Sequence, residues 1–153
     1  MKRVVVIGSV ASAALAIAVA AAMAGMGARV VGTGLRSGST PALITVNAHA
    51  SGTGVTAAGK ARIRTDLWLA KIRVTCIRHA DGLVLVGGLV TATSAPAGPG
   101  WGAVIAIADG GRGVRDQVGY GFEPPPPTTS TDCSVDPSTF PLAALKNGNF
   151  AVK

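Results

Sequence analysis

Short segments of alternating apolar and polar residues, divided by glycine and proline, constrain the fold of this 153-residue chain more than any other feature of its sequence. None of these segments shows the 3.6-residue period of a helix. The expected strands cover residues 43–50, 60–69, 72–78, 83–93, 101–108, 116–122 and 148–153. About seven short strands with frequent turns predict an all-β fold, a single antiparallel β-sandwich or a small barrel, and the sequence does not distinguish the two.

Several connections between these strands also have recognisable sequences. The run Pro124 to Pro127 predicts a stiff spacer, because proline has no N–H for a sheet. Residues 141–145 are expected to form a short helical turn. We expect the last strand to pair near residues 43–50, which would place the two ends of the domain close together.

The first residues have the three parts of a secretory signal peptide. Lys2 and Arg3 are followed by an uncharged run from Val4 to Ala28, and Ala22 and Ala24 are the small residues that a signal peptidase reads. Residues 1–24 are therefore predicted to be a signal helix that is removed. The alternative is an uncleaved membrane anchor, since the run has the length of a bilayer span. Its strongly apolar part is short, which favours cleavage.

The rest of the chain divides into a linker and one domain. Residues 25–41 are rich in Gly, Ser and Thr and show no period, so we expect a flexible linker there. Residues 42–153 are expected to form the β domain. A domain that follows a cleaved leader would be secreted or otherwise extracytoplasmic, in the medium or the cell envelope; the anchored form is the alternative.

The chain has two cysteines, Cys76 and Cys133, both beyond the leader. An even number of cysteines in an oxidising compartment predicts one disulfide, which would contribute about 3–5 kcal/mol because the loop that it closes is long. The alternative is two unpaired cysteines that act as small buried hydrophobes.

Basic residues alternate with apolar ones on two neighbouring predicted strands. Strand alternation places them on one face of each strand, opposite Ala61, Ile63, Ile72 and Val74. If the strands pair, five cations share one solvent-facing surface: Lys60, Arg62, Arg64, Lys71 and Arg73. Acidic residues instead predominate over residues 109–136, so the domain is expected to be electrically asymmetric.

These five residues are the candidates for binding an anion. Outside the cytoplasm the partner would be an acidic envelope polymer, lipid headgroups or an acidic protein, and export argues against nucleic acid. The alternative is that the cations only solubilise the strand face and protect a sheet edge from aggregation.

The sequence offers no catalytic, cofactor or metal site. His49 and His79 are the only histidines, and no serine lies in a G-x-S-x-G elbow. The loop from Asp109 to Asp116 could hold calcium weakly, but it has few oxygen ligands and carries two arginines, so a plain hairpin loop is favoured. We expect a monomeric, non-enzymatic domain; a secreted hydrolase is the alternative.

The order of several short motifs resembles a known family. They are Val74-Thr75-Cys76, Val86-Gly87-Gly88-Leu89-Val90, Ile105 to Asp109 with Gly110-Gly111, Asp116-Gln117, the proline-rich stretch, Cys133 and Gly148-Asn149-Phe150-Ala151-Val152. Over roughly residues 45–152 the chain is similar to small secreted, mostly actinobacterial proteins of uncharacterised function related to the post-COAP domain. The resemblance implies a secreted β domain and supplies no catalytic residues. The loop that is acidic in the family has the sequence Asp-Gly-Gly-Arg-Gly-Val in this chain, at residues 109–114. An arginine replaces an acidic residue there, which argues further against a bound metal.

Overall fold

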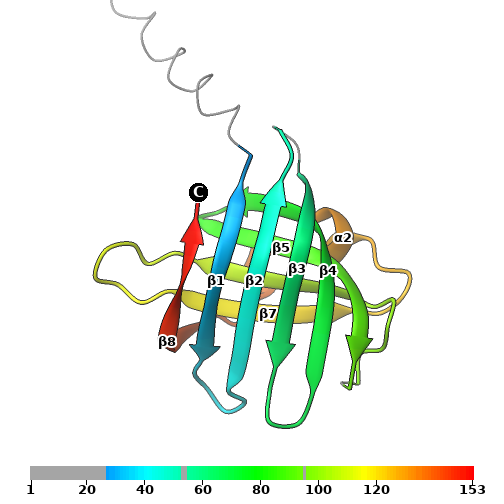
Figure 1. The fold of residues 1–153 in the computed structure, drawn as a ribbon, viewed down its shortest axis with the longest axis horizontal. Coiled ribbons are helices and arrows are strands. Elements are labelled where there is room, and N and C mark those ends of the chain that lie inside the picture. The colour runs from blue at the N-terminus through cyan, green and yellow to red at the C-terminus, as the bar shows by residue number, and fades with distance from the viewer. Residues whose placement is uncertain (1–26, 53–54, 95) are drawn as a thin grey trace, which may run out of the picture.

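The computed structural model describes residues 27–52, 55–94 and 96–153, which form a closed antiparallel barrel of eight strands. The predicted signal peptide, residues 1–24, lies outside the described residues. Figure 1 shows β1 to β4 side by side in one layer, with β5 and β7 crossing behind them. The strands are β1 (Arg29–Arg36), β2 (Ala42–Ala50), β3 (Thr56–Arg64), β4 (Leu69–Ala80), β5 (Leu83–Thr93), β6 (Gly102–Ala108), β7 (Gln117–Glu123) and β8 (Ala143–Val152).

Each strand pairs with the next along the chain, and β8 returns to pair with β1, so the sheet has no free edge. The all-β prediction is confirmed, and the architecture is a barrel rather than a sandwich. Two short helical segments, α2 (Thr129–Asp132) and the 3-10 helix Pro137–Thr139, lie between β7 and β8. Within the described part of the chain, no helix has the length and apolar character needed to cross a bilayer.

The interior of the barrel is filled by small and β-branched side chains. On β2 the predicted inward set, Ile44, Val46 and Ala48, is almost fully buried. Val, Ile and Ala from the other strands complete this core, and Phe150 is its one large aromatic residue among the fully buried side chains. Each buried Val or Ile contributes about 1.5–3 kcal/mol through the removal of apolar surface from water.

The prediction of a flexible linker over residues 25–41 was wrong, because β1 occupies residues 29–36 within it. Gly32 and Gly34 interrupt the apolar alternation of this segment. Both lie where a side chain would point inward, and a Cβ there would collide with Phe150 and Leu145, respectively. Side chains of β8 therefore fill the interior next to these two glycines. As a result, the sequence of β1 does not show the alternation of apolar residues that predicts a strand.

The last strand also differs from its prediction. It begins at Ala143 rather than 148, so residues 143–145 are extended and not a helical turn. It pairs with β1 and, through Gln117 opposite Ala144, with β7. It does not pair with residues 43–50, because β1 lies between them. The chain ends do meet, since the N–H of Arg29 donates to the carbonyl of Lys153 at 2.8 Å.

A buried carboxylate supports the short junction between β7 and β8, where only two residue pairs are in register. Asp116 is 3 % exposed. Its Oδ2 accepts a hydrogen bond from the N–H of Phe150 at 2.7 Å, and its Oδ1 accepts one from the N–H of Gly110 at 3.0 Å. Charged acceptors make hydrogen bonds that are about twice as strong as neutral ones. The Asp116 carboxylate therefore replaces backbone hydrogen bonds that β7 and β8 do not make with each other.

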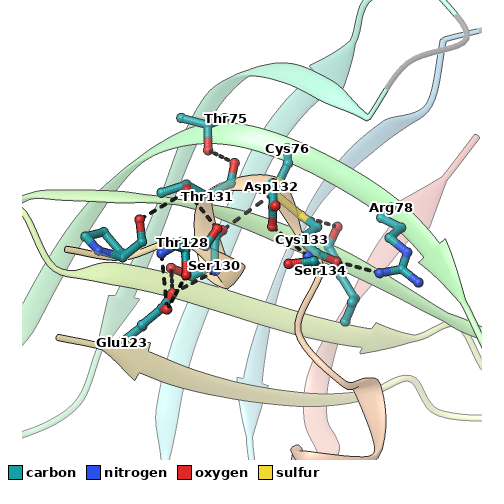
Figure 2. Close-up of a disulfide and its surroundings, with 12 residues drawn as sticks. Thr75, Cys76, Arg78, Glu123, Thr128, Ser130, Thr131, Asp132, Cys133 and Ser134 are labelled. Atoms are coloured by element: carbon teal, nitrogen blue, oxygen red, sulfur yellow. Dashed lines mark hydrogen bonds between the residues drawn. A yellow bond between two sulfur atoms is a disulfide. The ribbon is translucent and has the colours of Figure 1, made fainter. Parts of the chain in front are cut away.

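Residues 124–142, here called the covering segment, lie over the outer face of β5 and β6. A second apolar cluster fills the space between, formed by Cys76, Leu85, Val104, Ala106 and Cys133. The predicted disulfide between Cys76 and Cys133 is confirmed, with Cα atoms 5.9 Å apart, and it ties the covering segment to β4 (Figure 2). Gly87 makes the close approach possible, since a Cβ there would strike the carbonyl of Ser130 and both sulfurs.

Candidate functional site

The five basic residues predicted to share a surface do so, because β3 and β4 pair in the register that this requires. Lys60 lies opposite Arg73, and Arg62 lies opposite Lys71. Arg64 follows on the same face of β3, and all five side chains are exposed. Their inward neighbours Ala61, Ile63, Ile72 and Val74 are buried in the core. We call this surface the basic face and define it by these five residues.

Four residues of the basic face, all except Arg64, line an open groove of about 710 Å³ that runs across four strands. Thr45 and Asn47 of β2 extend it on one side, since they pair with Arg62 and Lys60, respectively. Thr91 of β5 extends it on the other side. The stems of the long cationic side chains form the walls of the groove, while their charged ends stay in water. The arrangement offers cationic and neutral hydrogen-bond donors to one ligand.

No carboxylate of the described residues neutralises this face. None of the five side chains makes an ion pair or a hydrogen bond to another residue of the described ranges. In each of the two cross-strand pairs, two positive charges therefore lie directly opposite each other. Such a placement destabilises a sheet by about 0.5 kcal/mol per pair. A bound anion would remove this repulsion.

Three of the seven carboxylates lie in or next to the covering segment, away from the basic face: Glu123, Asp132 and Asp136. Desolvation raises the pKa of Glu123, but hydrogen bonds from Ser130, Thr128 and Thr129 outweigh it and lower the pKa to about 2. Figure 2 shows Thr128 and Ser130 beside the Glu123 carboxylate, to which Ser130 donates from its Oγ at 2.6 Å and from its backbone N at 2.8 Å. Hydrogen bonds from Ser134 likewise lower the pKa of Asp132. These groups hold fixed negative charge, which gives the barrel the predicted asymmetry.

The remaining titratable side chains do not converge on one point. His49 lies on the outer face of β2 and His79 lies near the turn between β4 and β5, and both are exposed. In the loop between β6 and β7, Asp109 accepts a hydrogen bond from the N–H of Gly111 at 2.8 Å, and both oxygens of Asp116 accept from backbone N–H groups, of Gly110 and Phe150. The described residues contain no group of three or more His, Cys, Asp or Glu side chains placed to hold a metal.

An aromatic cluster at one end of the barrel was not predicted. Trp68 meets the rings of Phe122 and Tyr120 edge to face, with centroids 5.7 and 6.0 Å apart. Trp101 joins them around a cavity of about 310 Å³. We call these four residues the aromatic mouth. They are far apart in the sequence, so only the closure of the barrel brings them together. The one signal in the sequence that could have indicated the cluster is that the chain has few other aromatic residues.

Comparisons with protein-family models, with curated proteins and with solved structures found no match to this chain. The resemblance to proteins related to the post-COAP domain therefore stays a prediction, and the site is interpreted from its own geometry.

Proposed function

We propose that this protein is an extracytoplasmic, non-enzymatic binding domain that holds an anionic partner on its basic face. The register between β3 and β4 is the observation that carries the proposal, because it places Lys60 beside Arg73 and Arg62 beside Lys71, and no carboxylate in the described part of the chain contacts them. A surface kept only for solubility has no need to align its cations in repelling pairs. A ligand site gains from that alignment, because several charges act on one anion.

The extracytoplasmic location is supported by the disulfide. Cys76 and Cys133 are paired, and such bonds persist in oxidising compartments. The signal peptide and the release of the domain remain part of the proposal. Intact mass of the protein from culture medium tests them: a chain that begins at Gly25 supports secretion, and one that retains residues 1–24 favours the membrane-tethered form.

Anion binding is tested with a charge-reversed variant. Arg62→Glu with Arg73→Glu leaves each cross-strand pair with opposite charges, so the fold should be retained or slightly stabilised. The matched control is Arg112→Glu with Lys146→Glu, which changes the net charge equally at exposed positions off the basic face. Retention on immobilised sulfated dextran is measured at rising salt, because exposed charges are screened within about 8 Å at physiological ionic strength.

We expect the basic-face variant to elute at much lower salt than the control, with an affinity at least 30-fold weaker, since each cation near an anionic surface contributes about 1 kcal/mol. Equal retention of the two variants would show that only net charge matters and would refute the proposed site.

A further inference from the structure

We infer that the barrel docks onto a bilayer containing anionic phospholipid, with the turn between β3 and β4 entering the headgroup region and the basic face lying against the headgroups. This inference rests on the proposed anion-binding function and names its partner. Apolar residues lie beside the basic face at one end of the barrel, and their order along the strands points to this partner.

The most exposed large apolar side chain of the described residues lies at the tip of this end. Leu67, in the turn between β3 and β4, is 84 % exposed, and Trp68 beside it is half-buried. An exposed leucine by itself is unremarkable on a protein surface. Its position matters here because it projects from a hairpin whose two strands carry the basic face.

A row of three leucines and one cation, Arg64, lies between this tip and the other cations of the basic face. Strand pairing places Leu35 beside Leu43, Leu43 beside Arg64, and Arg64 beside Leu69 across four neighbouring strands. Leu43 is 39 % exposed on the outer surface. The next row toward the barrel centre contains Arg62 and Lys71. The outer surface is therefore mostly apolar in this end row, where Arg64 is flanked by leucines, and cationic in the next row toward the barrel centre.

The aromatic mouth opens at the same end of the barrel. Trp68 belongs to the turn itself, and the N–H of Ser94, at the start of the loop that leads to Trp101, donates to the carbonyl of Leu69 at 2.9 Å. Tryptophan and tyrosine favour the boundary between lipid headgroups and acyl chains, where an apolar ring and a polar N–H or O–H are both satisfied. Most of the chain's few aromatic residues are thus at the end that we assign to the membrane.

This order matches a bilayer better than a soluble acidic polymer. A polymer would need the cations alone and would leave Leu67 and Leu43 in water. A bilayer interface takes apolar groups at depth and cations at headgroup level, and the two contributions add. Asp66, in the same turn, is the one acidic group between Lys60 and Arg73, and it should weaken the contact.

The test measures sedimentation of the protein with vesicles of phosphatidylcholine alone or mixed with phosphatidylglycerol. The wild type is expected to bind only the mixed vesicles, with a blue shift of tryptophan emission. Leu43→Ser with Leu67→Ser should weaken binding about tenfold or more, while Asp66→Asn should strengthen it about fivefold. The matched control is Val55→Ser with Val114→Ser, since both valines are exposed, at 45 % and 64 %, away from this end.

The outcomes separate this inference from the function on which it rests. If the leucine variant binds mixed vesicles as well as the control does, while Arg62→Glu with Arg73→Glu fails to bind, the anion site stands and the docking end is wrong. Binding to sulfated dextran without binding to mixed vesicles would overturn the bilayer in favour of a polymer. Binding to neither overturns both. Unchanged thermal unfolding of each variant verifies that it is folded.

Discussion

Reduction of the Cys76–Cys133 disulfide should weaken the barrel by an amount that follows from its place in the chain. The bond joins residues 57 positions apart. The chain-entropy relation then gives about 14 cal/mol/K of lost entropy in the unfolded state, or about 4 kcal/mol at 25 °C. The strands and their closure do not depend on the bond, because the ladder from β1 to β8 is continuous. The reduced protein should therefore stay folded but be less stable.

Urea unfolding, followed by far-UV circular dichroism with and without reductant, measures this difference. Reduction is preferable to substitution because Cys76 and Cys133 are 1 % and 0 % exposed, and truncation of either would add a packing defect to the lost cross-link. With a denaturant slope of about 2 kcal/mol/M, the midpoint should fall by about 2 M urea. The folded baseline should not change.

The covering segment should respond first when the bond is reduced. Its remaining ties to β4 are hydrogen bonds, from Thr75 Oγ1 to the carbonyl of Thr131 at 2.7 Å and from Arg78 to the carbonyl of Cys133 at 3.0 Å. Hydrogen exchange over residues 124–142 should accelerate before that of the strands. Coincident midpoints for the oxidised and reduced protein, within about 0.3 M urea, would refute the reasoning, since they would mean that the cross-link restricts the unfolded chain very little.

Three further substitutions test single contacts. Glu123→Gln should flatten the loss of thermal stability on acidification. A pKa lowered from 4.5 to about 2 gives the wild type stability that is full above about pH 4.5 and disappears as pH falls through 2, so the melting temperatures of wild type and variant should differ most above pH 4.5 and converge in that window. Asp116→Ala should cost about 3 kcal/mol in urea unfolding and speed hydrogen exchange at the Phe150 amide, and unchanged exchange there would contradict the hydrogen bond. Gly87→Ala should cost more than about 2 kcal/mol through overlap with the disulfide, whereas Gly98→Ala, with only ring atoms of a tryptophan at 3.8 Å, should be nearly neutral in the same assay.

The local alternation of side chains was enough to predict β5 to the residue and to place Lys60, Arg62, Arg64, Lys71 and Arg73 outside the barrel. It succeeded because successive residues of a strand point to opposite faces, so a buried Ile63 or Ile72 dictates where its neighbours lie. Local pattern failed at β1, where Gly32 and Gly34 carry no side chain to reveal the inward face and the filling atoms come from β8.

Pairing partners and closure were decided only in the tertiary structure. Alternation says which face a cation takes, but the opposition of Lys60 to Arg73 depends on the register of two strands, which the turn at residues 65–68 sets. The aromatic mouth depends on the bending of the whole sheet into a barrel, and the support of the β7–β8 junction depends on a carboxylate whose amide partner is 34 residues away. Sequence thus determined the face of each side chain, because that is a property of one strand. Only the tertiary structure determined which strands pair and which side chains come into contact. Such contacts join segments far apart in the chain, and the entropy lost in closing the loops between them cannot be estimated from a local sequence pattern.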